Sequence, residues 1–266
     1  MKSEREQGRM TVYDTWVKNF PGKLSSHPEF PDLPAPGGGS DHVPFGTFLG
    51  VPIITFTYKN ATWTESYPLY HSLYETPFMN EHIFDTNHMA VHRSIGQFWA
   101  EVARAFADPP ILPLNVSMYA QTLLGVYVSD LKKTLDSLKN RFPQEFAKQA
   151  KAIDNKVKEI SKKFPTDHLD YRRIKSINDR LVAVDRCFVN PWGMTHGPSK
   201  RHVLYSISDK DSYSAQVMPG VYDEITNIIH AENGKERNEA GKELARQISI
   251  IQISVKCATN TLLDMI

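Results

Sequence analysis

From about residue 81 onward, apolar residues recur at alternating steps of three and four, and this spacing limits what the chain can fold into. Such a stripe lies on one face of an α-helix, where it packs against other helices. We interpret these residues as the core of a helical assembly, with Ser117 expected to cap the second helix. The stripes run through residues 91–106, 124–138, 146–160, 174–188 and 244–262.

The composition is that of a soluble globular protein of 266 residues, 41% of them hydrophobic. A net charge of +1 gives no reason to expect nucleic acid as a partner. No apolar run approaches the roughly 20 residues that span a bilayer, and the polar start of the chain does not resemble a signal peptide. Cys187 and Cys257 fit neither a disulfide framework nor a cysteine zinc site, so we expect buried free thiols.

The first eighty residues follow a different pattern, in which loops surround a short helix and a strand. Residues 1–40 are rich in Pro, Gly and Ser and predict a long irregular loop. A short helix is expected after Asp41 and ends at Gly50, and the β-branched and aromatic residues 51–58 predict a strand. This order is typical of the edge of an α/β domain. Residues 190–220 form a second irregular stretch, which is long enough to carry function.

Three loop segments carry residue types suited to binding or catalysis. The glycine-rich residues 37–45 permit a close approach of the backbone to a ligand. In the second segment, His71 has the imidazole of a zinc ligand, and the phenol of Tyr70 beside it is able to stabilise an oxyanion. Tyr213 lies in the third, which is bounded by Gly and Pro. The sequence contains no HExxH, P-loop, GxSxG or CxxC motif.

The order of these segments resembles the family of glutamate carboxypeptidase II and the transferrin receptor. In its zinc peptidases a Gly/Ser-Asp-x-x-x-Phe segment precedes a Tyr-His-[Ser/Thr]-x-x-[Asp/Glu]-Thr loop, and here these patterns fall at residues 40–45 and 70–76. Further along, NDRLVAVDRCFVNPWG, RHVLYS and MPGVYD are similar to the helical domain of glutamate carboxypeptidase II. VYDTWVK also matches, so the resemblance runs from Tyr13 to the C-terminus.

This resemblance implies a fold and a division into domains. It implies an α+β chain in which residues 1–109 are the C-terminal piece of an α/β zinc-peptidase domain. Residues 110–266 would then form an all-α, transferrin receptor-like dimerisation domain, and the chain would pair with itself as a homodimer. The resemblance also implies that the full-length parent enters the secretory pathway and acts outside the cell or at its surface. Glycosylation sequons at Asn60 and Asn115 agree with that location.

The resemblance implies roles for individual residues as well. His71 matches the last zinc ligand, and Tyr70 matches the neighbouring tyrosine that contacts the substrate and the tetrahedral intermediate. Gly39 and Ser40 match the loop that lines the acyl side of the peptide substrate, and Tyr213 matches the tyrosine that grips the substrate carboxylate. In that mechanism two zinc ions polarise the peptide carbonyl and activate a bridging water, while a glutamate acts as general base.

Departures from the family pattern limit what this chain is expected to do. The other zinc ligands and the catalytic glutamate have no counterpart here, so we expect the isolated chain to bind no stable zinc pair and to be inactive. Glutamate-selective members carry Arg-x-Arg at residues 55–57 and a Lys-Tyr pair at residues 212–213, where this chain has Thr-Phe-Thr and Ser-Tyr. The missing cations predict a weaker preference for acidic C-termini. Two hypotheses stay open: the C-terminal part of a zinc exopeptidase, or a non-catalytic dimerisation and interaction module.

The last helical stripe gives a reason to expect a dimer that does not depend on the resemblance. Ile250 and Ile253 lie off the face that carries the other apolar residues of this helix. An apolar band wider than one core face needs a second surface to cover it. A two-fold contact would bury the band on both chains, and the alternative is that an upstream domain of the parent covers it.

Overall fold

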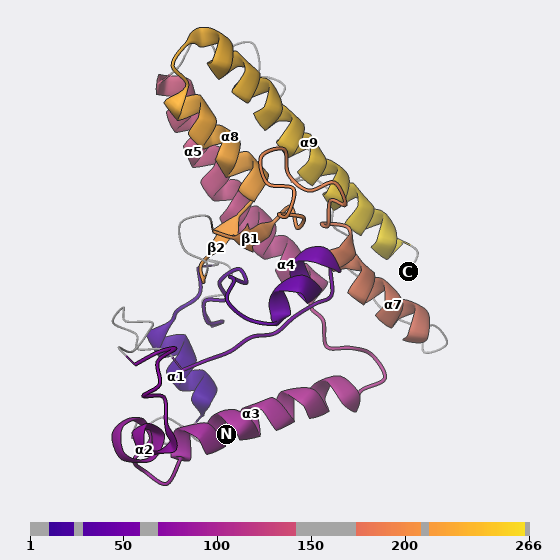
Figure 1. Ribbon diagram of the computed structural model, residues 1–266. Helices are drawn as coiled ribbons and strands as arrows, with labels where there is room; N and C mark the ends of the chain where they lie inside the picture. Colours follow the sequence, from indigo (N-terminus) through magenta and orange to yellow (C-terminus); the bar gives the residue numbers. More distant parts are fainter. Residues whose placement is uncertain (1–10, 24–28, 59–68, 142–173, 209–212, 264–266) are drawn as a thin grey trace. The chain divides into compact units, whose positions relative to one another are not determined.

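The computed structural model divides into two compact units, which are described separately (Figure 1). Unit 1 comprises Met1–Leu33 and Phe56–Pro113, and unit 2 comprises Pro34–Thr55 and Leu114–Ile266. The structure is mostly helical, with one small two-stranded sheet among the residues that it describes. None of the described helices combines the length and the apolar character needed to cross a membrane. The described residues are 11–23, 29–58, 69–141, 174–208 and 213–263.

Unit 1 is built around one long helix. Its elements are α1 (Val12–Asn19), α2 (Pro77–Met79), the π-helical turn η2 (Asn80–Phe84) and α3 (Ala90–Ala107). The apolar stripe of residues 91–106 predicted α3, and this prediction is confirmed. The helix ends just before Pro109 and Pro110, whose rings cannot continue it.

Asp85 satisfies the first turn of α3 from outside the helix. Its carboxylate accepts the backbone N–H of Val91 at 3.1 Å and that of His92 at 2.9 Å, and it lies 2.8 Å from Nδ1 of His92. Burial of Asp85 opposes its ionisation, but the hydrogen bonds from His92 and Val91 outweigh burial and lower the carboxyl pKa from 3.8 to about 2. The cap is therefore strongest when Asp85 is ionised.

Replacing Asp85 with Ala is expected to lower the thermal midpoint of unit 1 at neutral pH, because two N–H groups at the start of α3 lose their acceptor. The depressed pKa makes the contribution of the wild-type cap complete above about pH 4 and lost as the pH falls through about 2. Circular dichroism melts between pH 6 and pH 2 would measure both effects. Asp85→Asn is the matched control, since it keeps the shape but cannot ionise. Equal pH dependence in all three proteins would contradict this account.

Residues 51–58 form no strand, so that prediction is wrong. A strand needs a neighbouring strand for its hydrogen bonds, and the two strands of the described chain pair with each other. In unit 1, Phe56 instead packs edge-on against Phe98 with ring centroids 4.6 Å apart, and the hydroxyl of Tyr58 lies 3.0 Å from that of Ser94. The aromatic residues that favoured a strand serve as contacts to α3.

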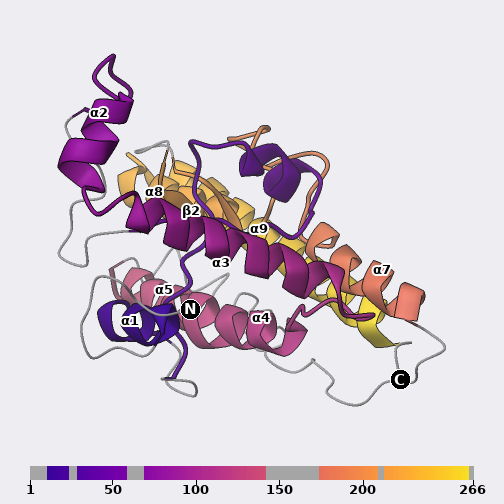
Figure 2. The ribbon, with the colours of Figure 1, turned by 90° about the horizontal axis from the view of Figure 1, so that it is seen from below.

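Unit 2 holds the larger helical core. Three contiguous elements cover residues 116–141, and α8 and α9 lie side by side as an antiparallel pair (Figure 1 and Figure 2). The stripes of residues 124–138, 174–188 and 244–262 are confirmed as helical, although α7 stops at Arg186; residues 146–160 lie outside the described chain. The helices are η1 (Pro44–Phe48), α4 (Val116–Thr122), η3 (Leu123–Val128), α5 (Ser129–Arg141), α7 (Ile174–Arg186), α8 (Pro219–His230) and α9 (Gly234–Leu263).

The core of unit 2 uses the predicted face of α9. Leu244, Ile248 and Ala258 are completely buried, and Phe188 and Met218 join them from neighbouring segments. Burying a Leu or Ile side chain contributes about 1.5–3 kcal/mol, so this face alone supplies much of the stability of the unit.

The cap of α4 differs from the prediction. Asn115, two residues before the expected Ser117, accepts the backbone N–H of Met118 at 3.0 Å through its side-chain oxygen. Asparagine is as good an N-cap as serine, so local preference did not separate the two positions.

Part of the stretch predicted to be irregular, residues 190–220, is ordered. β1 (Tyr205–Ile207) and β2 (Ala215–Val217) pair antiparallel, with Tyr205 opposite Val217. Helix α8 then begins at Pro219, directly after Met218 in a left-handed conformation with φ of 45°. The hairpin and α8 were not predicted.

Cys187 and Cys257 form a disulfide with their Cα atoms 5.6 Å apart, so the prediction of free thiols is wrong. The two residues are 70 positions apart, and they meet because the end of α7 packs against α9. Cys257 is exposed and Cys187 is half-buried. The pairing depends on tertiary contact between two helices, which the spacing of the cysteines does not reveal.

Candidate functional site

The glycine-rich segment and Tyr213, two of the predicted substrate-binding features, lie against each other in unit 2. The backbone N–H of Gly38 donates to the carbonyl oxygen of Tyr213 at 3.2 Å. Gly39 has a φ of +76°, and a Cβ atom there would lie 2.3 Å from Cδ1 of Tyr213. A Cβ atom on Gly37 would lie 2.0 Å from the Tyr213 carbonyl oxygen. Only glycine allows this contact, because any side chain would collide with the tyrosine.

His42 closes the same loop, and sequence reasoning missed it. Its Nε2 lies 3.0 Å from the carbonyl oxygen of Gly37, and the N–H of Val43 donates to the carbonyl oxygen of Ser40 at 3.3 Å. Ser40, the other residue predicted to line the substrate, is exposed at the turn into η1. No local pattern singles out His42, since its partner is a backbone atom five residues earlier.

Tyr70 and His71, the predicted catalytic and metal-binding pair, form an exposed turn in unit 1. The two rings are stacked, with centroids 3.9 Å apart and 19° between their planes. His71 has a φ of 57°, in the left-handed region that residues with a Cβ rarely adopt. Its backbone N–H donates to Oε2 of Glu75 at 2.8 Å. Backbone strain of this kind often occurs at functional positions.

His71 is suited to act as one ligand of a metal ion. Within the described residues no hydrogen bond to either of its ring nitrogens is formed, and the side chain is exposed. No group of three or more His, Cys, Asp or Glu side chains in the described part of the chain has a metal-binding arrangement. The imidazole fits a zinc site only as one contributor, with the remaining ligands coming from outside these residues.

Two of the three positions that predicted a weaker preference for acidic C-termini, Thr55 and Thr57, lie in the described part of the structure. Ser212 lies outside the described residues. Thr55 and Thr57 flank Phe56, whose ring packs on Phe98 and Trp99 within unit 1. The segment therefore presents two short neutral side chains where the glutamate-selective pattern has arginines.

A buried polar network crosses the core of unit 2, and no pattern in the sequence predicted it. The hydroxyl of Tyr119 donates to Oδ1 of Asp185 at 3.2 Å, and Nε2 of His202 lies 3.4 Å from the same oxygen. His202 is completely buried and stacks on Tyr205 at 3.8 Å. Burial raises the pKa of Tyr119 well above 10, and the nearby Asp185 carboxylate adds to the shift. These groups hold α4, α7 and β1 together within the core.

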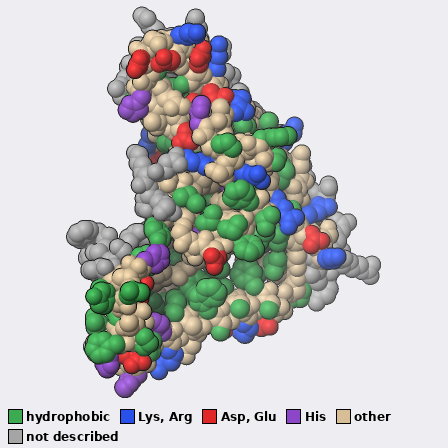
Figure 3. Space-filling model, in the orientation of Figure 1, with side chains coloured by type: hydrophobic (Ala, Val, Ile, Leu, Met, Phe, Trp, Pro, Cys, Tyr) green, Lys and Arg blue, Asp and Glu red, His purple; other side chains and the backbone are tan. Residues whose placement is uncertain are grey.

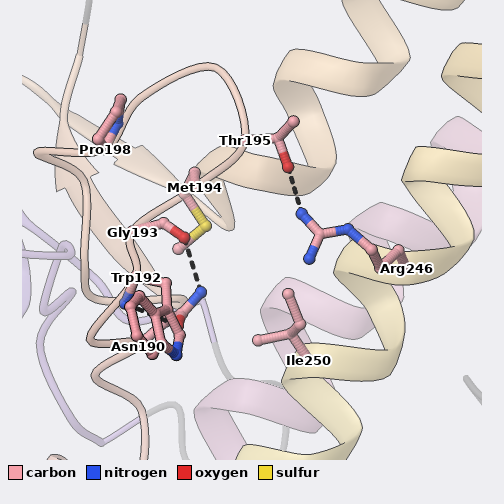
Figure 4. Close-up of a pocket in the computed structure, with 8 residues that line it drawn as sticks. All are labelled: Asn190, Trp192, Gly193, Met194, Thr195, Pro198, Arg246 and Ile250. Atoms are coloured by element: carbon pink, nitrogen blue, oxygen red, sulfur yellow. Dashed lines mark hydrogen bonds between the residues drawn. The ribbon is translucent and has the colours of Figure 1, made fainter.

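A hollow of about 520 Å³ lies between the loop after α7 and the exposed side of α9 (Figure 4). Trp192 stands at its edge and is 87% exposed, while Arg246 and Ile250 approach from α9. Arg246 is tied to Thr195 and to both carboxylate oxygens of Glu243, each 2.8 Å from its Nε. The hydrogen bonds from Arg246 outweigh burial and lower the pKa of Glu243 to about 2. The remaining lining residues are Asn190, Gly193, Met194 and Pro198.

Comparisons with known proteins identify the family to which this chain belongs. Residues 126–263, more than half of the chain, match the family described as the transferrin receptor-like dimerisation domain. A glutamate carboxypeptidase 2 homolog of Caenorhabditis elegans is 42% identical over 282 aligned residues, covering 100% of this chain and 36% of that protein. Aminopeptidase NAALADL1 of Mus musculus is 26% identical, covering 96% of this chain and 34% of its own length. The chain thus spans about a third of the length of these relatives. The match to the dimerisation domain, together with these relatives, confirms the resemblance found in the sequence: the chain belongs to the glutamate carboxypeptidase II-like and transferrin receptor-like family.

Proposed function

We propose that this chain is the C-terminal part of a zinc-dependent exopeptidase. In this proposal it supplies one zinc ligand, part of the substrate pocket and the dimerisation domain. The observation that carries the proposal is the turn at Tyr70 and His71, where an exposed imidazole stacks on a phenol and its ring nitrogens form no hydrogen bond within the described residues. A purely structural descendant would need neither group.

Each predicted residue has a specific task in this proposal. His71 would hold a zinc ion, and the pair of zinc ions in the full-length parent would supply Lewis acid chemistry for peptide hydrolysis. Tyr70 would donate a hydrogen bond to the oxygen that becomes negative as the carbonyl is attacked. Gly39 and Ser40 line the acyl side of the substrate, and Tyr213 binds its terminal carboxylate. The contact between the glycine loop and Tyr213 supports the last two roles.

The isolated chain is expected to bind no stoichiometric zinc and to hydrolyse no dipeptide, because His71 alone cannot hold two metal ions. Metal analysis after dialysis and a dipeptide hydrolysis assay would measure this. In the full-length parent, His71→Ala should abolish turnover and reduce the zinc content. Two tightly bound zinc ions in the isolated chain would contradict the first expectation. A fully active His71→Ala parent would favour the non-catalytic module instead.

We also propose that the parent does not select strongly for acidic C-terminal residues. Thr55, Thr57 and Ser212 carry no positive charge, and a hydrogen bond to a charged group contributes about 1.5–3 kcal/mol. Losing such contacts reduces the preference by about tenfold or more. A peptide panel that compares Glu with Leu at the C-terminus tests this proposal, and a strong preference for Glu would overturn it.

A symmetric homodimer through unit 2 completes the proposal. Ile253 is 68% exposed on α9, and Ile250 lines the hollow beside Trp192. Figure 3 shows hydrophobic side chains gathered on the face of the molecule that carries this loop and α9. A two-fold contact joins one patch to itself, so the patch must be complementary to itself, as a projection beside a depression is. Trp192 and the hollow next to it meet that requirement.

Ile253→Asp is expected to weaken the dimer by about tenfold or more, because a central apolar contact is replaced by a charge. Sedimentation across a dilution series would measure the change. Ser137→Asp is the control, since it adds the same charge at an exposed position of α5. A wild-type chain that stays monomeric at micromolar concentration would refute the dimer. A dimer insensitive to Ile253→Asp would place the contact elsewhere.

The parent is proposed to pass through the secretory pathway. A disulfide between Cys187 and Cys257 is typical of oxidising compartments. Asn115 is exposed and uses its side-chain oxygen as the α4 cap, so a glycan on its nitrogen would leave the cap intact. The sequon at Asn60 lies outside the described residues. Glycosidase treatment of native material should lower its mass, and an unchanged mass would argue against this location.

A further inference from the structure

We infer that Glu75 is a positioning residue that fixes the direction in which His71 presents its imidazole. The inference rests on the proposed role of His71 as a metal ligand, but it concerns how the turn is built. The left-handed backbone of His71 is the first observation, with a φ of 57°. A residue with a Cβ keeps this conformation only when its surroundings hold it there.

The hydrogen bond from the His71 N–H to Oε2 of Glu75 is what holds it. At 2.8 Å it is a short bond to a carboxylate, and such bonds are about twice as strong as those between neutral groups. The φ angle of His71 sets the direction of its Cα–Cβ bond relative to this N–H. A carboxylate anchored four residues later therefore restrains the conformation that turns the imidazole toward Tyr70.

The rest of the turn anchors Glu75 itself. Its backbone N–H donates to the carbonyl oxygen of Ser72 at 3.2 Å. The hydroxyl of Ser72 in turn donates to the carbonyl oxygen of Leu69 at 2.7 Å. Thr76, the next residue, caps α2 by accepting the N–H of Met79 at 3.3 Å. Thr76 therefore caps α2, and the carboxylate of Glu75 accepts the N–H of His71.

Nuclear magnetic resonance of the 266-residue chain tests the inference with Glu75→Ala and Glu75→Gln. In Glu75→Ala, the His71 amide should exchange with solvent about tenfold faster or more, the gain expected from losing a hydrogen bond to a charged group. Cross-relaxation between the Tyr70 and His71 rings should weaken with it. Glu75→Gln keeps an acceptor oxygen and should restore part of both signals.

Two comparisons separate positioning from general support of the fold. The Met79 amide should keep its exchange rate in Glu75→Ala, because Thr76 still caps α2. In a His71→Gly background the Glu75→Ala change should leave the backbone conformation of residue 71, read from its Cα chemical shift, nearly unchanged, because glycine adopts the left-handed conformation unaided. Unchanged exchange of His71, or equal acceleration at Met79, would overturn the inference. Failure of the zinc measurements would instead reject the proposed function and leave the role of Glu75 in the turn intact.

Discussion

Replacing Cys187 and Cys257 with serine is expected to lower the free energy of unfolding of unit 2 by about 4 kcal/mol. The disulfide joins residues 70 positions apart, and the loss of unfolded-state entropy grows with the size of the closed loop. Loops of about 15 and 100 residues correspond to about 3 and 4.7 kcal/mol, which brackets this one. A domain with a typical stability of about 5–15 kcal/mol would lose a large share of it.

Urea denaturation followed by circular dichroism would measure this loss. Either single serine substitution should cost about as much as the pair, because the first already removes the cross-link. Wild-type protein treated with a reductant should approach the double variant, and the exposure of Cys257 leaves the bond open to attack in the folded state. An unchanged urea midpoint after complete reduction would show that the cross-link contributes no stability.

Gly50→Ala is expected to destabilise unit 2 by about 2–5 kcal/mol, for two additive reasons. Gly50 has a φ of +57°, and the left-handed region costs a residue with a Cβ about 1–2 kcal/mol. A Cβ atom there would also lie 2.6 Å from Cα of Arg186 and 2.9 Å from its backbone nitrogen. Overpacking of this kind costs about 1–3 kcal/mol, and backbone atoms at the end of α7 cannot rotate away.

Gly234→Ala is the matched control for this substitution. Gly234 begins α9 in the same unit, and an added Cβ there meets nothing within 4 Å. Alanine is a better helix former than glycine by up to about 1 kcal/mol, so this variant should be neutral or slightly more stable. Comparing the two urea midpoints isolates the packing of Gly50 on α7. Equal stabilities of the two variants would contradict the close approach.

Helical periodicity predicted most of the fold because it is a local property of the chain. The stripe of α9 places Leu244, Ile248 and Ala258 in the core as expected. Helix α8 was not predicted, although Val221, Ile225 and Ile228 form an apolar stripe on its buried face. The Pro and Gly at its start suggested the end of a loop, yet proline is favoured in the first turn of a helix, where its missing N–H has no partner to lose.

The candidate site shows a different limit on prediction. Only the resemblance to the family points to Tyr70, His71 and Tyr213, because no local pattern distinguishes them from other loop residues. The contact between Gly39 and Tyr213 joins segments far apart in the chain, so the local sequence of neither segment predicts it. The carboxylate of Glu75 stands only four residues from His71, but its importance depends on a backbone dihedral angle that the sequence does not state.

The contact of the glycine loop with Tyr213 has a thermodynamic consequence. Residues 34–55 pack within unit 2, the same unit that contains the dimerisation match of residues 126–263. Any binding event that favours the folded form of unit 2 also raises the fraction of molecules in which this loop is formed. Under the proposed function, self-association would therefore be linked to the order of the substrate-lining loop. Dilution below the dimer dissociation constant would then lower substrate affinity without any change in the residues that touch the substrate.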